Sequence, residues 1–220
     1  MMQNGSDHRG AVATDELAVR CSPRPDPEVG AARGAPEIDL PGATAAAETF
    51  LRALGVCFDD ESTIKSPRRM AEAYAALLTA REFEMTTFPN SENYDELVIV
   101  RSIPVQSVCE HHFLPFAGVA HVGYLPDARI VGLSKLARVV EKFAHRPQTQ
   151  ERLTQQIANH LDAHLSPKGV GVVVEAEHTC MTLRGVRAAG TTTSTSALTG
   201  LLRSRAQTRA EFFACIRAGA

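Results

Sequence analysis

The run VGVVVEAEHTC at residues 170–180 limits the possible folds of this chain more than any other segment. Its β-branched valines favour an extended strand. The run ends with His178 and Cys180, which are two residues apart. Because residues two apart on a strand point to the same face, we expect these two side chains to project together. The chain must therefore build a sheet that carries two potential metal ligands near the end of one strand.

The remaining pattern alternates blocks of helix and strand. Apolar residues at helical spacing, such as Leu153 and Ile157, predict two helices after residue 132, and Thr208 with Glu211 forms a T-x-x-E capping box that predicts the start of a last helix. In the strand-like run 97–105, Pro104 is expected to end or bulge the strand. The order predicts an α+β fold with an antiparallel sheet. The other expected elements are helices over 43–56 and from Ser66, and strands over 117–125, 130–131 and around 184–194.

Composition places the chain among soluble globular proteins and divides it into two parts. Residues 1–40 are rich in Gly, Ala and Pro without an apolar period, which predicts a flexible tail, and residues 41–220 form one predicted domain. A net charge of −2 argues against a nucleic-acid partner. An apolar run of about 18 residues, which a membrane span needs, is not found. Five irregularly spaced cysteines argue against a disulfide framework, so we expect a cytoplasmic protein.

Two short segments contain most of the residues that can do chemistry. They are Cys109-Glu110-His111-His112 and His178-Thr179-Cys180. Zinc favours thiolate and imidazole ligands, and catalytic zinc sites use three protein ligands with water in the fourth position. Cys109 and His112 can meet one ion from a single turn, and Cys180 would complete a Cys2His set. A structural metal and unrelated buried cysteines remain alternatives at this point.

Other polar residues favour less specialised roles. Glu110 is expected to be a structural hydrogen-bonding partner, and His121 a core histidine. His160 and His164 are expected to face solvent, and Cys215 to pack in the core.

A basic helix face offers a candidate anion site. Lys135, Arg138 and Lys142 share one side of a predicted helix, and Gly132 and Ser134 lie at its start, where free N–H groups attract anions. A solvated helix face is the alternative. Walker-type and G-x-G-x-x-G motifs are both missing from the sequence.

Three segments, in this order and separation, resemble GTP cyclohydrolase I. They are SVCEHHFLPFAG (107–118), VGLSKLARVVEKFAHRPQTQERLTQQI (131–157) and HTCMTLRGVR (178–187), and the resemblance covers roughly residues 45–217. It implies the tunnelling fold, with a four-stranded antiparallel sheet, two long helices on one face and an N-terminal helical pair. It also implies a ring-shaped homodecamer of two pentamers with sites at subunit boundaries.

The resemblance implies hydrolysis of GTP at C8 of the purine, release of formate, an Amadori rearrangement and closure to 7,8-dihydroneopterin triphosphate. It assigns Zn2+ to Cys109, His112 and Cys180, makes His178 the proton donor to the imidazole part of guanine, and places His111 near the ribose. Glu151 with Gln150 would contact the guanine edge. The ribose and triphosphate contacts would be Ser134, Lys135, Arg138, Arg184 and Arg69.

Two other functions compete with this interpretation. A related tunnelling-fold enzyme that reduces a nitrile would lack the full Cys2His set and the phosphate-binding Lys and Arg. A zinc-stabilised binding protein without catalysis would have no use for His111 and His178.

Overall fold

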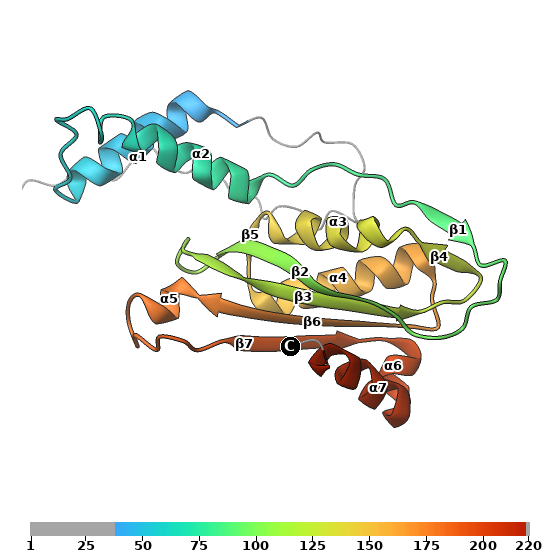
Figure 1. The fold of residues 1–220 in the computed structure, drawn as a ribbon. Coiled ribbons are helices and arrows are strands. Elements are labelled where there is room, and N and C mark those ends of the chain that lie inside the picture. Colours follow the sequence, from blue (N-terminus) through green and yellow to red (C-terminus); the bar gives the residue numbers. More distant parts are fainter. Residues whose placement is uncertain (1–37, 219–220) are drawn as a thin grey trace, which may run out of the picture. The chain divides into compact units, whose positions relative to one another are not determined.

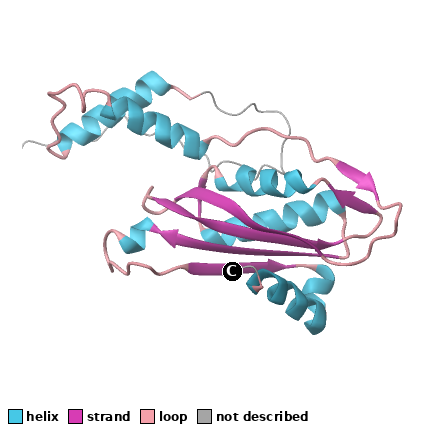
Figure 2. Cartoon of the chain, in the orientation of Figure 1, coloured by secondary structure: helices cyan, strands magenta, loops and turns pink. Residues whose placement is uncertain are grey.

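The computed structural model describes residues 38–218 (Figure 2). The predicted tail, residues 1–40, lies almost entirely outside this range, so the division at residue 40 remains a prediction. The elements in chain order are α1 (Leu40–Ala53), α2 (Ser66–Leu78), β1 (Thr87–Pro89), β2 (Val98–Cys109), β3 (Pro115–Leu125), β4 (Arg129–Val131), α3 (Leu133–Ala144), β5 (Pro147–Gln148), α4 (Gln150–Leu165), β6 (Gly169–His178), α5 (Thr179–Thr182), β7 (Thr193–Leu198), α6 (Gly200–Ser204) and α7 (Ala206–Arg217).

The main sheet has the strand order β5-β2-β3-β6-β7 (Figure 1). Its four longer strands pair antiparallel, which confirms the predicted sheet type. The predicted number of four strands is too low, because β5 adds a fifth strand that pairs parallel with the end of β2. This strand is only two residues long, so it leaves no alternation in the sequence from which to predict it. Strands β1 and β4 form a separate two-stranded sheet.

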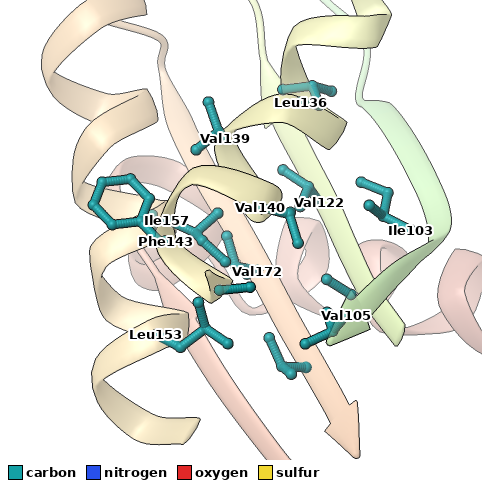
Figure 3. Close-up of a cluster of buried hydrophobic side chains, with 14 of the residues drawn as sticks. Ile103, Val105, Val122, Leu136, Val139, Val140, Phe143, Leu153, Ile157 and Val172 are labelled. Carbon is teal, nitrogen blue, oxygen red and sulfur yellow. The ribbon is translucent and has the colours of Figure 1, made fainter. Parts of the chain in front are cut away.

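Helices α3 and α4 cover one face of the main sheet, and their apolar stripes form the larger core with it (Figures 1 and 3). Val140 and Phe143 of α3 meet Leu153 and Ile157 of α4 over Val172 of β6, and all five are almost fully buried. The 3.6-residue spacing of these side chains is what gives each helix a single apolar side. The two predicted long helices on one face are therefore confirmed.

Helices α6 and α7 pack a smaller core on the opposite face. This core contains Leu202, Phe212 and Ile216, which pack against Val173 of β6. The neighbouring residues Val172 and Val174 belong to the larger core on the other face. This alternation is the two-residue period of a strand that is covered on both sides. The predicted capping box at Thr208 is wrong, because α7 already begins at Ala206 after the extended residue Arg205.

Strand β2 contains the irregularity that Pro104 predicts. The register with β3 shifts between Val100 and Ile103, and Ser102 has a positive φ of 55°. The strand continues through Pro104 itself, which pairs with Val119. The bulge therefore lies just before the proline, and β2 runs on to Cys109.

Other predicted boundaries differ by a few residues. Helix α1 begins at Leu40, before the expected residue 43, because the Asp39 side chain accepts a hydrogen bond from the Gly42 N–H and caps it. The strand expected around 184–194 is mostly wrong, because β7 runs from Thr193 to Leu198 and overlaps the expected range at two residues. Within residues 38–218, no helix has both the length and the apolar composition that crossing a membrane requires.

Candidate metal centre

Strand β2 ends at Cys109, and a tight turn follows it. The Phe113 N–H donates to the Cys109 carbonyl at 2.8 Å, and the Cys109 N–H donates to the Leu114 carbonyl at 2.9 Å. The turn brings His112 back onto the strand end, with its Nδ1 atom 3.7 Å from the Cys109 Sγ atom. Two of the three predicted ligands therefore meet through local structure.

The third ligand arrives from β6 and α5. In the β3–β6 register His178 faces Phe116, and the Thr179 hydroxyl donates to the Pro115 carbonyl at 2.6 Å. The strand ends at His178, so Cys180 lies on the short helix α5 and does not share a strand face with His178 as the spacing predicted. A helical turn projects residues two apart in different directions.

The donor atoms of Cys109, His112 and Cys180 all lie within 4.8 Å of one another and could hold a metal ion. These three residues are called the metal group below. A tetrahedral zinc site has donor atoms about 3.5–3.8 Å apart, given bonds of about 2.3 Å to sulfur and 2.0–2.1 Å to nitrogen. Burial and the neighbouring Cys109 raise the pKa of the Cys180 thiol, whereas the charge of Arg184 acts in the opposite direction. A bound cation would reverse that increase, because it stabilises thiolates. The donor set therefore fits a soft divalent metal.

His178 lies beside this group in a defined orientation. Its ring stacks on Phe116, with centroids 4.4 Å apart and planes at 13°. Its Nε2 atom lies 2.8 Å from Oε1 of Gln150. Burial lowers the pKa of His178, and the negative charge of Glu151 partly offsets this effect. Glu151 itself is exposed in the first turn of α4.

The carboxamide of Gln150 is buried between strands, not directed at an open surface. Its Nε2 atom donates to the carbonyls of Val174 and Thr193, at 2.9 and 2.8 Å. Carbonyl oxygens only accept, so these bonds fix the amide orientation and leave Oε1 to accept from His178 Nε2–H. Gln150 thus determines which nitrogen of His178 carries a proton when the ring is neutral.

His111 lies at the edge of the group and is exposed. Its Nδ1 atom is 3.9 Å from the Cys109 Sγ atom, and its Nε2 atom is 3.8 Å from Oε1 of Glu110. It therefore remains near the metal group without belonging to it.

The structure does not bring the predicted phosphate contacts of α3 to the metal group. The C-terminal end of α3 packs beside the end of β2, because Ser107, two residues before Cys109, donates to the Ala144 carbonyl at 2.6 Å. Ser134 and Lys135 lie at the other end of this 12-residue helix, which at 1.5 Å per residue spans about 18 Å. Arg138 lies between the two ends.

The two remaining predicted arginines differ in position. Arg184 follows α5 closely enough for its charge to act on Cys180. Arg69 lies on α2, where it donates to the Ser62 carbonyl at 3.2 Å. Helix α2 reaches the metal-binding turn through Tyr74, whose hydroxyl donates to the Phe113 carbonyl at 2.8 Å.

Three residues at the site were missed from the sequence: Phe116, Gln148 and Arg152. Arg152 pairs with Glu110 and donates from Nε to Oε1 of Gln148 at 2.8 Å. One signal was available, because a basic residue in the first turn of a helix is disfavoured by the helix dipole and suggests a specific partner. The pairing confirms Glu110 as a structural hydrogen-bonding partner.

Predictions for the other histidines and Cys215 had mixed outcomes. His121 is buried as expected, with Nε2 3.7 Å from Glu175. His164 is exposed as expected, but His160 is buried against Phe143, so its predicted exposure is wrong. Cys215 is exposed although a core position was predicted, because Phe212 and Ile216 alone take the buried side of α7.

Comparisons with known proteins agree across most of the chain. Residues 43–217 match the family model described as GTP cyclohydrolase I. A protein named GTP cyclohydrolase 1 from Corynebacterium glutamicum is 47% identical over 82% of this chain and 95% of its own length. Proteins of the same name from Aquifex aeolicus and a Sulfurihydrogenibium species are 46% and 49% identical, over 78% and 74% of this chain and 94% and 87% of theirs.

One solved structure, the archaeosine synthase QueF-Like in the apo form, aligns with 47% of this chain and 93% of its own at a TM-score of 0.38 and 20% identity. That likeness is too weak to bear on the fold or the function.

Proposed function

The chain belongs to the GTP cyclohydrolase I family, and from that premise we propose that its reaction takes place at the Cys109, His112 and Cys180 group with His178 as proton donor. The reaction is the conversion of GTP to 7,8-dihydroneopterin triphosphate, the first step of pterin and folate biosynthesis. The assignment rests on one observation: two thiols and an imidazole from two distant segments lie together beside His178, whose ring is oriented by Gln150.

We infer that zinc is the ion held by Cys109, His112 and Cys180, since thiolate and imidazole are its preferred ligands. When bound, zinc lowers the pKa of water towards about 7 and so supplies a nucleophile at neutral pH. Three protein ligands leave one position of a tetrahedron for that water. The described cysteines are all free thiols, which agrees with the proposed cytoplasmic location.

His178 is the proposed proton donor to the imidazole part of guanine. Because Nε2–H is committed to Gln150, the proton that His178 donates is carried on Nδ1 of the imidazolium form, and donation leaves the neutral ring with its remaining proton on Nε2. Stacking on Phe116 holds the ring plane in place, which matters because a general acid works only within hydrogen-bond reach. His111 assists near the ribose in this proposal.

The proposed guanine contact is Glu151, whose carboxylate can accept the paired N–H donors of the base. Gln150 was expected to share this contact, and its buried amide instead supports His178. Gln150 therefore assists guanine recognition indirectly, by keeping the proton donor next to Glu151.

Ser134, Lys135 and Arg138, with Arg184 and Arg69, are the proposed ribose and triphosphate contacts. Within one chain Ser134 and Lys135 lie a helix length from the metal group, so a complete site requires another subunit to supply them. The homodecamer of two pentamers that the family resemblance implies is the assembly we propose to supply them.

Two open sheet edges support such an assembly. Among residues 38–218, strand β7 has a neighbour on one side only, and the outer side of β2 is paired only at Val108 and Cys109, where β5 meets it. Open edges favour pairing with another chain. Pairing of β2 with β7 between copies would join the sheets into a ring.

Formate release from GTP by the zinc-loaded full-length protein tests the proposal directly. We expect formate to appear together with dihydropterin absorbance. Zinc-loaded protein that binds GTP but releases no formate would contradict the enzymatic assignment and favour a zinc-stabilised binding protein.

A further inference from the structure

Arg152, in the first turn of α4, contacts side-chain and backbone groups of three other residues. One guanidinium nitrogen contacts Oε2 of Glu110 and donates to the Pro147 carbonyl at 3.2 Å, and Nε donates to Oε1 of Gln148 at 2.8 Å. This planar fork spans the metal-binding turn, strand β5 and the first turn of α4. The contacts lie outside the metal group itself.

Gln148 gives Arg152 a fixed support. Its side chain is fully buried, and its Nε2 atom donates to the Phe143 carbonyl at 2.8 Å and to Oε1 of Gln156 at 2.9 Å. Since the Phe143 carbonyl can only accept, the amide nitrogen must face it and the amide oxygen must face Arg152. The guanidinium is therefore oriented from the core side.

Glu110 gives the other end of the connection. It lies between Cys109 and His111, and its N–H donates to the Gln148 carbonyl at 3.0 Å. Its carboxylate thus joins the turn that carries Cys109 and His112 to the helix that carries Glu151. The side chains of Arg152 and Glu110 are 43% and 30% exposed, so their attraction contributes little to global stability.

We propose that Arg152 is a positioning residue that fixes the metal-binding turn relative to Glu151, and so aligns C8 of the bound guanine with the metal. This inference rests on the proposed function. Misplacement of reacting groups by about 1 Å can cost about 100-fold in rate. An arginine suits this role because lysine, a single point charge, cannot contact the carboxylate, the amide and the carbonyl in one plane.

The test compares Arg152→Lys, Glu110→Ala and their double variant with wild type at saturating zinc. We expect kcat to fall about tenfold or more in each single variant, with KM for GTP within about threefold. The kcat of the double variant should be no lower than that of the more impaired single variant, because both changes break the same connection. Thermal unfolding midpoints should stay close to that of wild type.

A second readout follows zinc release with a chromogenic chelator. A loosened turn should release zinc about tenfold faster in both single variants. Glu48→Ala is the matched control, since it removes a carboxylate from the Arg52–Glu48 pair of 2.9 Å on α1. It should leave kcat and zinc release unchanged.

Single variants with wild-type kcat and zinc release, or losses that multiply in the double variant, would overturn the role of Arg152. Failure of wild-type protein to release formate would instead overturn the proposed function. In that case the zinc-release comparison still tests whether Arg152 holds the turn.

Discussion

The two ends of helix α4 bury polar side chains for different purposes. At the N-terminal end, Gln148 and Gln150 flank the cap residue Thr149, and each supports one half of the site. Gln148 supports the Cys109 turn through Arg152, and Gln150 orients His178. At the C-terminal end, the His160 ring lies tilted against that of His164, with centroids 3.9 Å apart and planes at 32°, and packs against Phe143.

The two ends of α4 therefore separate residues that support activity from residues that support stability. Gln148 and Gln150 form hydrogen bonds with Arg152 and His178 at the site, whereas His160 packs in the core between α3 and α4. Substitutions at the first end should therefore change turnover, and substitutions at the second end should change the free energy of unfolding.

The largest effect is expected at the site that the N-terminal end supports. Cys180→Ala should remove the metal and lower turnover by at least about a thousandfold, because the ion that activates water is lost. Zinc content and formate release measure the two parts of this prediction. Cys215→Ala, which removes an exposed thiol on α7, should retain both. Full zinc content in the Cys180 variant would show that the ligand is misassigned.

His178→Ala should lower kcat by about 100-fold or more while zinc stays bound, because a general acid is removed and a ligand is not. Formate release and zinc content in the same sample test this separation. Loss of the metal in this variant would place His178 among the ligands.

Gln150→Ala should have a smaller effect on kcat, about tenfold, because His178 remains but loses its partner on Nε2. It should also lower the free energy of unfolding by about 1–3 kcal/mol, since the Val174 and Thr193 carbonyls lose their donor. Urea unfolding and steady-state kinetics measure the two effects. A wild-type kcat in a destabilised Gln150 variant would contradict the claim that the N-terminal end of α4 supports turnover.

The smallest effect on turnover is expected at His160. Burial, followed by the charges of His164 and Lys142, lowers the pKa of His160 to about 4. The unfolded chain, with a pKa near 6.5, binds more protons in this window, so the free energy of unfolding falls as the pH falls from about 6.5 to 4, by up to about 3 kcal/mol.

His160→Leu should remove that dependence and leave kcat near the wild-type value. Urea unfolding at several pH values compares the two proteins. Parallel pH curves for wild type and variant would show that another group titrates there.

Much of the fold was predictable because periodicity reports which side of an element is buried. The stripes of α3 and α4 and the β-branched run of β6 were all identified, and the antiparallel sheet followed from their order. The short strand β5 and helix α5 were not predicted, since two or four residues cannot show a period. Their positions depend on pairing with Cys109 and on the end of β6.

The ligand types, their grouping in two segments and the family of the chain could all be read from the sequence. Which residues of the polar run Gln148–Arg152 are buried, and what they contact, depends on the folded arrangement of the strands around them. Gln150 and Arg152 depend on groups that are distant in the chain, because Gln150 donates to carbonyls on β6 and β7 and Arg152 pairs with Glu110 in the turn after β2. A polar side chain is buried only when such partners are in place, and local spacing carries no information about them.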